Sequence, residues 1–153
     1  LGLLVLSLSL FSCGNDQIFD EGAQLETDIL LIEDFLASNQ LEADTLLPSE
    51  IRIIVDDPGE DEKVDFGATV FTHYTGHLLD GTEFDSSEGG PPFSFVVDRG
   101  DVVQGWDIAF KELGKGGRAT FFLPSAMGYG NRALRDIPAN SVLVFEVQVI
   151  DIR

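Results

Sequence analysis

The stretch Ser141-Val-Leu-Val-Phe-Glu-Val-Gln-Val-Ile150 alternates apolar and polar residues in its second half and is rich in β-branched side chains. A period of two residues is typical of a strand that buries one face. Shorter stretches with strand character precede it, separated by Gly and Pro turns, at residues 51–55, 70–74, 93–97 and 120–123. The sequence therefore predicts a sheet of several antiparallel strands.

One segment breaks the strand pattern. Trp106, Ala109, Phe110 and Leu113 recur at helical spacing, and Gly114 follows as a natural end for a short helix. Several strands and one short helix predict an α+β domain, in which the sheet folds over the helix and Trp106 enters the core.

Length and composition limit the classes of protein to consider. The chain has 153 residues, enough for one domain and a short appendage, and 44% of them are hydrophobic. A single cysteine excludes a disulfide framework and a cysteine-built zinc site. The formal charge of −18 would repel a phosphate backbone, so we expect no nucleic-acid partner.

The charge is unevenly distributed. Residues 14–65 contain 16 acids and 2 bases, whereas residues 66–153 contain 11 acids and 7 bases. The first part is expected to be a solvated arm over 14–48, and residues 49–153 are expected to be the packed domain.

The first thirteen residues are almost wholly apolar and end in Leu10-Phe11-Ser12-Cys13. This run is too short to span a bilayer, which needs about 20 apolar residues, but it has the length of a signal-peptide core. Its ending resembles a bacterial lipoprotein processing site, although Phe11 is bulkier than the usual residue there. We expect 1–13 to be a partial lipoprotein signal peptide, with Cys13 as the lipidated residue. The alternative is a buried free thiol.

Within the arm, residues 24–38 place Leu25, Ile29, Ile32 and Leu36 at helical spacing. They predict an amphipathic helix with a narrow apolar stripe, which must pack on the domain or on a second copy of the chain. A membrane-surface helix is disfavoured because its polar face is acidic.

Six short motifs then follow one another in a fixed order over about a hundred residues. They are His73-Tyr-Thr-Gly76, Asp80-Gly-Thr-Glu-Phe-Asp-Ser-Ser87, Pro92-Phe-Ser-Phe95, Val102-Val-Gln-Gly-Trp-Asp107, Tyr129-Gly130 and Ile137-Pro-Ala-Asn-Ser-Val-Leu-Val-Phe145. Together they resemble the FKBP family of peptidyl-prolyl cis-trans isomerases, over residues 51 to 153. The preceding arm is similar to that of lipoprotein forms from Bacteroidetes-like bacteria.

The resemblance implies a half-barrel sheet wrapped around one helix and an apolar pocket that binds proline. Trp106 would form the floor of this pocket, and the walls would be Phe84, Phe93, Val102, Val103, Ile137 and Phe145, together with Tyr74. Tyr129 would offer its hydroxyl to the substrate, the Val103 N–H would be a second donor, and Asp85 would pair with Tyr74. Tyr74, Asp85 and Tyr129 are therefore the expected catalytic residues.

The resemblance also implies partners and a location. The partners would be proline-containing polypeptides and macrolide inhibitors, and no cofactor or metal is required. With a lipid anchor, the protein is expected in the cell envelope, on the periplasmic face or in the outer membrane, where it would accelerate the folding of exported proteins.

Other interpretations remain open for the same residues. The apolar pocket residues could be ordinary core, and Asp85 could cap the turn at Ser86-Ser87. A binding module could hold proline-containing segments without catalysing their isomerisation. His73 and His77 lack the further ligands that a metal site needs. Acidic residues at 85, 101 and 136 fall in or beside the pocket motifs and would affect the charge near the substrate.

Overall fold

The computed structural model of the protein describes residues 20–153, so the predicted signal peptide and Cys13 lie outside the described residues. The described chain contains α1 (Glu21–Ser38), β1 (Asp44–Leu46), β2 (Ile51–Asp57), β3 (Thr69–Leu78), β4 (Glu83–Ser86), β5 (Phe93–Val96), α2 (Gln104–Ala109), the 3-10 turns η1 (Phe110–Glu112) and η2 (Ser125–Met127), β6 (Arg118–Leu123) and β7 (Leu143–Ile152). None of its helices is long and apolar enough to cross a membrane.

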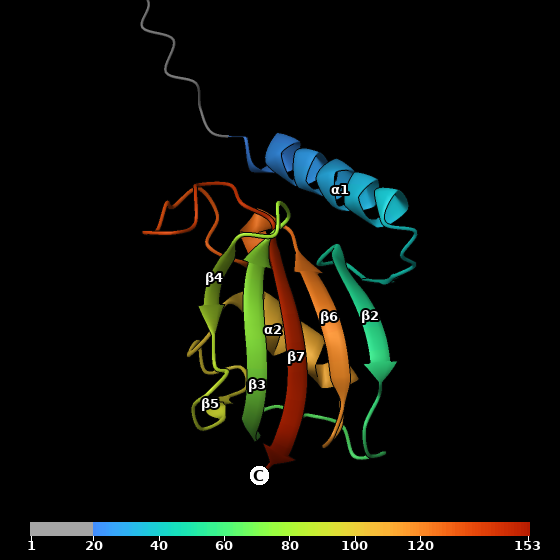
Figure 1. The fold of residues 1–153 in the computed structure, drawn as a ribbon, viewed down its shortest axis with the longest axis vertical. Coiled ribbons are helices and arrows are strands. Elements are labelled where there is room, and N and C mark those ends of the chain that lie inside the picture. Colours follow the sequence, from blue (N-terminus) through green and yellow to red (C-terminus); the bar gives the residue numbers. More distant parts are fainter. Residues whose placement is uncertain (1–19) are drawn as a thin grey trace, which may run out of the picture.

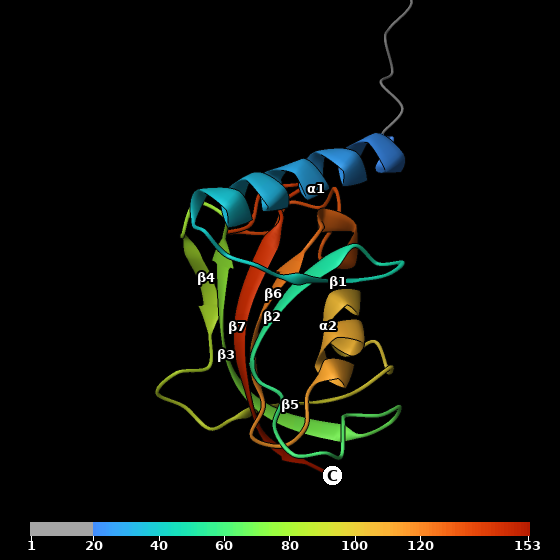
Figure 2. The ribbon, with the colours of Figure 1, turned by 90° about the vertical axis from the view of Figure 1, so that its right-hand side faces the viewer.

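All strands belong to one antiparallel sheet in the order β1-β2-β6-β7-β3-β4, and β5 also pairs with β3. The sheet is strongly curved, and α2 lies on its concave side (Figures 1 and 2). The predicted α+β class is therefore confirmed. The pattern of apolar residues did not indicate β1 and β4, which have only three and four residues.

The main core fills the space between α2 and the concave face of the sheet. Trp106, Ala109 and Phe110 enter it from the helix and its extension η1, and Phe121 and Phe145 enter it from the two central strands. The predicted helix is shorter than expected, because the α-helical hydrogen bonding ends at Ala109 and a 3-10 turn follows. Trp106 is only 3% exposed, as predicted.

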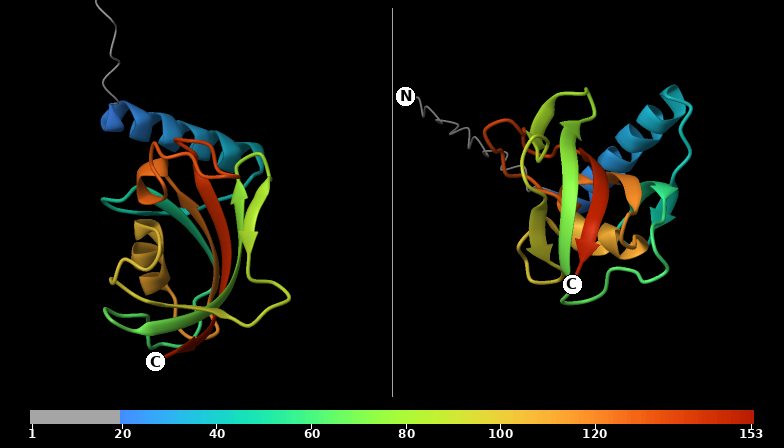
Figure 3. Two further views of the ribbon diagram at one scale, coloured as in Figure 1. Left: turned by 90° about the vertical axis from the view of Figure 1, so that its left-hand side faces the viewer. Right: turned by 60° about the horizontal axis from the view of Figure 1, so that its bottom comes forward.

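Helix α1 packs on the opposite face of the same strands. Strand residues alternate between faces, so Phe121 belongs to the main core whereas Phe122 belongs to a second cluster. Ile32 and Leu36 of α1 complete this second cluster, together with Val142 and Val144. The helix lies across one end of the sheet (Figures 1 and 3). The predicted apolar stripe thus docks on the same chain.

Polar contacts also connect the arm to the domain. Arg52 of β2 is 8% exposed and donates to Glu33 of α1 at 2.7 Å and to Glu50 at 3.1 Å. Strand β1 pairs with β2 across the expected boundary between residues 48 and 49. The arm and the domain are therefore connected both by the packing of α1 and by the pairing of β1 with β2.

The packing of α1 predicts a position-specific loss of stability. Ile32→Ala removes a side chain that is 1% exposed, and the unfilled space should lower the free energy of unfolding by about 2 to 5 kcal/mol. Leu30→Ala on the same helix is the matched control, because Leu30 is 66% exposed; it should change stability by no more than about 0.5 kcal/mol. Urea denaturation measures both variants. Equal effects would show that α1 is not docked as described.

Candidate functional site

An aromatic cavity of about 160 Å³ opens on the concave side of the sheet, beside the start of α2. Strands β3, β4, β5 and β7, the segment leading into α2, α2 itself and the loop after η2 all contribute to its lining. The lining residues are Tyr74, Phe84, Asp85, Phe93, Asp101, Val102, Val103, Trp106, Tyr129 and Phe145.

The indole of Trp106 is the centre of the aromatic packing. Its ring centroid lies 5.0 Å from that of Tyr74, 5.2 Å from that of Phe145 and 6.0 Å from that of Phe93, all nearly edge to face. Edge-to-face pairs are favoured because the positive ring edge meets the negative ring face. These contacts fix the orientation of the cavity floor and of three walls.

Gly76 on β3 leaves room for the rings of Phe84 and Phe145, which form one wall of the cavity. A Cβ atom at Gly76 would lie 2.6 Å from the Phe84 ring and 3.0 Å from the Phe145 ring, closer than side chains pack. Phe84 and Phe145 instead meet each other at right angles, with their centroids 5.5 Å apart. Any larger residue at position 76 would displace one of these two walls.

Tyr74 and Asp85 form the predicted hydrogen bond. The Tyr74 hydroxyl donates to Asp85 Oδ2 at 2.6 Å, and Asp85 Oδ1 accepts from the Ser86 N–H at 2.9 Å. Burial, followed by this bond and the charge of Asp85, raises the pKa of Tyr74 well above its usual value. Tyr74 is therefore neutral at any physiological pH and keeps Asp85 oriented at the side of the cavity.

The second tyrosine offers a free hydroxyl. Tyr129 Oη has no hydrogen-bond partner among residues 20–153, although the side chain lines the cavity. Burial, and then the negative charge of Asp85, raises the pKa of Tyr129, and the positive charge of Arg132 opposes this rise. The hydroxyl is thus protonated and available to donate to a bound molecule.

Two further N–H groups near the cavity lack acceptors within the described part of the chain. The backbone N–H of Val103, at the start of α2, donates to no carbonyl or side chain there. The Trp106 Nε1–H is buried and also without a partner. Unsatisfied buried donors are rare in proteins, and binding sites are among the places where they occur.

Ser87 is a positioning residue that the sequence motifs did not distinguish from its neighbour Ser86. Its Oγ accepts from the backbone N–H of Tyr74 at 2.9 Å, and its own N–H donates to the Tyr74 carbonyl at 3.0 Å. These bonds hold the loop after β4 against Tyr74. Only the pairing of β3 with β4 brings these residues together, so no local sequence signal could have revealed it.

The structure brings nine of the ten predicted site residues to one cavity. The tenth, Ile137, is not among the residues that line it; its side chain is 6% exposed and belongs to the main core cluster. Asp101 lines the cavity, as its place beside the pocket motifs suggested. Asp136 does not; its side chain is 61% exposed, near Arg135. The acidic character of the cavity therefore comes from Asp85 and Asp101.

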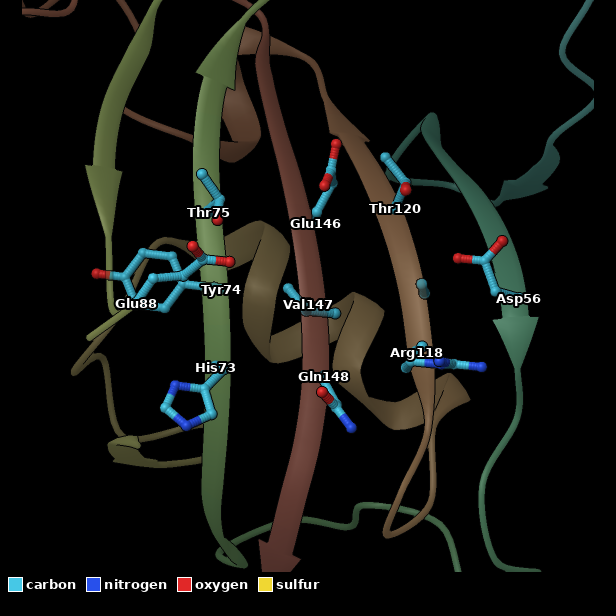
Figure 4. Close-up of a pocket in the computed structure, with 11 residues that line it drawn as sticks. Asp56, His73, Tyr74, Thr75, Glu88, Arg118, Thr120, Glu146, Val147 and Gln148 are labelled. Atoms are coloured by element: carbon cyan, nitrogen blue, oxygen red, sulfur yellow. The ribbon is translucent and has the colours of Figure 1, made fainter. Parts of the chain in front are cut away.

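A different hollow, of about 320 Å³, lies on the outer face of the sheet. Figure 4 shows its polar side chains on neighbouring strands, with α2 behind them. His73 and Thr75 of β3 stand opposite Gln148 and Glu146 of β7 in the strand register. Of the aromatic residues that surround the concave cavity, only Tyr74 also lines this hollow, and its other lining residues are mostly polar. Residues 20–153 contain no cluster of three or more potential metal ligands.

Comparison with known proteins identifies the family. The family model for FKBP-type peptidyl-prolyl cis-trans isomerases matches residues 60–150. The chain is 38% identical over 107 residues to the FKBP-type peptidyl-prolyl cis-trans isomerase FkpA of Buchnera aphidicola, covering 69% of this chain and 42% of that protein. It is 40% identical over 103 residues to FK506-binding protein 4 of Gibberella zeae, covering 66% and 21% respectively.

The fold is also similar to a solved structure. The crystal structure of FkpA from Escherichia coli matches with a TM-score of 0.72 and 31% identity, covering 86% of this chain and 64% of that one. The chain spans less than half the length of the two curated relatives named above. The aromatic cavity, the fold and the family model agree, and the chain belongs to the FKBP-type peptidyl-prolyl cis-trans isomerase family.

Proposed function

We propose that the protein catalyses cis-trans isomerisation of X-Pro peptide bonds in polypeptide substrates. The observation that carries this proposal is the cavity beside α2, whose Trp106 floor and aromatic walls are combined with the unpaired Tyr129 hydroxyl. This combination suits a ring-shaped apolar group joined to a polar carbonyl, as in proline and the amide that precedes it.

The physical task is to lower the barrier to rotation about one amide bond. That barrier is about 18 to 20 kcal/mol, because rotation breaks the resonance of the planar amide. The planar amide is more polar than the twisted one. A cavity that removes water around the bond therefore destabilises the planar ground state relative to the twisted transition state. No nucleophile, proton transfer or cofactor is needed for this effect.

The polar groups would hold the substrate while its bond rotates. The Tyr129 hydroxyl and the Val103 N–H are donors without partners in the described chain, so each is free to bind a substrate carbonyl. Asp85 is held at the side of the cavity by Tyr74. The alternative function, a module that binds proline-containing segments without turnover, would use the same walls and donors.

The deciding experiment is an isomerisation assay without protease. Magnetisation-exchange NMR on a peptide with a Leu-Pro bond should show faster exchange when the protein is added. Tyr129→Phe keeps the ring and removes the donor, so it should lower kcat/KM roughly tenfold, which corresponds to about 1.4 kcal/mol. Peptide binding with no acceleration of exchange would favour the binding module and overturn the proposed activity.

The two acids of the cavity predict a substrate preference. Asp85 and Asp101 lie in its wall, and a Glu before proline would place a like charge near them, at a cost of about 1 kcal/mol or more. Leu or Phe there would gain by burying surface, at about 25 cal/mol per Å². We expect kcat/KM for Leu-Pro to exceed that for Glu-Pro by roughly tenfold or more.

The test of this preference is a peptide series that differs only in the residue before proline, measured at low and high salt. High salt should narrow the gap between Leu and Glu, because ions screen the repulsion. Equal rates for the two peptides at low salt would contradict the prediction and would show that the two acids do not set the preference before proline.

We also propose macrolide binding and a location for the activity. Relatives of the chain carry the name FK506-binding protein, and an apolar cavity of this kind suits macrolides of the same class. The apolar run before Cys13 supports lipid anchoring in the cell envelope, on the periplasmic face or in the outer membrane. The clients would then be exported proteins.

Anchoring at Cys13 is tested in the full-length protein. Cys13→Ala should abolish labelling with a radioactive fatty acid and move the protein out of the membrane fraction, because lipoprotein attachment needs the thiol. Ser12→Ala keeps the thiol and is the matched control. Continued lipid labelling of the Cys13→Ala variant would contradict the proposal.

A further inference from the structure

A buried carboxylate connects α1 to the loop that carries Tyr129. Asp28 of α1 is 0% exposed, although most acids of this helix face solvent. Its Oδ2 accepts from both the backbone N–H of Ser125 at 2.7 Å and the Ser125 hydroxyl at 2.6 Å, and its Oδ1 accepts from the Gln24 amide at 2.7 Å. A buried charge is costly unless donors surround it, and here all three partners are donors.

Ser125 is in turn hydrogen-bonded to both neighbours of Tyr129 in the sequence, Gly128 and Gly130. Ser125 is 1% exposed, and its carbonyl accepts from the Gly128 N–H at 2.9 Å and from the Gly130 N–H at 2.8 Å. The backbone on each side of Tyr129 is thus tied to the one residue that Asp28 holds. Gly130 has φ of +59°, a conformation that glycine adopts without strain.

The loop is fixed at its far side as well. The Gly130 carbonyl accepts from the Asn140 N–H at 2.8 Å, so the segment with Tyr129 is held between Ser125 and the turn that leads into β7. Tyr129 itself has no side-chain hydrogen bond in the described chain and lines the cavity. Its hydroxyl position therefore depends on its backbone, and this backbone depends on Ser125.

We propose that Asp28 is a positioning residue for the isomerase site: through Ser125 it holds the Tyr129 hydroxyl where a substrate carbonyl binds. The effect of Asp28 on the position of Tyr129 is independent of the proposed function; only the expected effect on the rate of isomerisation rests on it. Small displacements of a positioned group can cost large factors in rate. Loss of Asp28 should therefore lower kcat, while KM changes little because the apolar walls remain.

The chain has only two tyrosines, Tyr74 and Tyr129, which allows a direct readout of position. Protein labelled with 3-fluorotyrosine should give two ¹⁹F NMR signals, and Tyr129→Phe assigns them. Asp28→Ala should shift or broaden the Tyr129 signal and leave the Tyr74 signal in place. Ser125→Ala, which removes only the hydroxyl bond, should give a smaller change of the same kind, and it carries the test if Asp28→Ala fails to fold.

The kinetic arm compares Asp28→Ala with Leu36→Ala. Leu36 is 5% exposed and lies two turns further along α1, so its truncation also weakens helix packing but touches neither Ser125 nor the cavity. Asp28→Ala should lower kcat roughly tenfold, and Leu36→Ala should leave it unchanged. In a Tyr129→Phe background, Asp28→Ala should cause no further loss, because the group that it positions is absent.

Three results would overturn the inference: an unchanged Tyr129 signal in folded Asp28→Ala and Ser125→Ala, an equal loss of kcat in Leu36→Ala, or a full further loss in the Tyr129→Phe background. Failure of the proposed function is a separate outcome, since unaltered protein would then not accelerate exchange at all. In that case the ¹⁹F signals alone decide whether Asp28 positions Tyr129.

Discussion

The packing of Trp106 into the concave face of the sheet is the constraint on which the site depends. Helix α2 has six residues and is about 9 Å long, whereas β3 and β7 have ten residues each and span about 33 Å. So short a helix leaves part of the concave face uncovered. Trp106, at the start of the helix, packs edge to face with Tyr74, Phe93 and Phe145, and the cavity lies among these rings.

The central strands support two clusters at once. Phe121 and Phe145 belong to the main core cluster beside α2. Their neighbours in sequence, Phe122 and Val144, belong to the second cluster, against α1. The same strands thus connect the packing of the arm with the packing of the site. The two hydrogen bonds that Ser125 donates to Asp28 add a polar connection between these layers, close to the loop of Tyr129.

Periodicity and motif order predicted much of this structure. The alternation in 141–150 and the helical spacing from Trp106 to Leu113 predicted the fold class, and the motifs predicted nine residues of the cavity. Strands β1 and β4 were not predicted because each is short and has a single large apolar residue, whereas β5, with four residues, has two phenylalanines and a valine. Apolar character alone could not separate Ile137, which packs in the core cluster without lining the cavity, from Phe145, which does both.

Asp28 shows the limit of sequence reasoning most clearly. Asp28 lies one turn before Ile32 on the buried face of α1, but the helical pattern gives no partner that would offset the cost of burying an acid there. Its partner Ser125 is 97 residues away, so only the docking of α1 across the sheet brings the two together. Burial of a charge is decided by tertiary structure, not by local pattern.

The two edges of the sheet are short, which affects whether other extended chains can pair with them. One edge is β1, of three residues, and the other is shared by β4 and β5, of four residues each. Long open edges recruit other extended chains into intermolecular sheets, whereas short, charged ones resist this. Asp44, Glu83 and Asp85 lie on these edges. The short, charged edges of this sheet therefore offer other extended chains little backbone on which to pair.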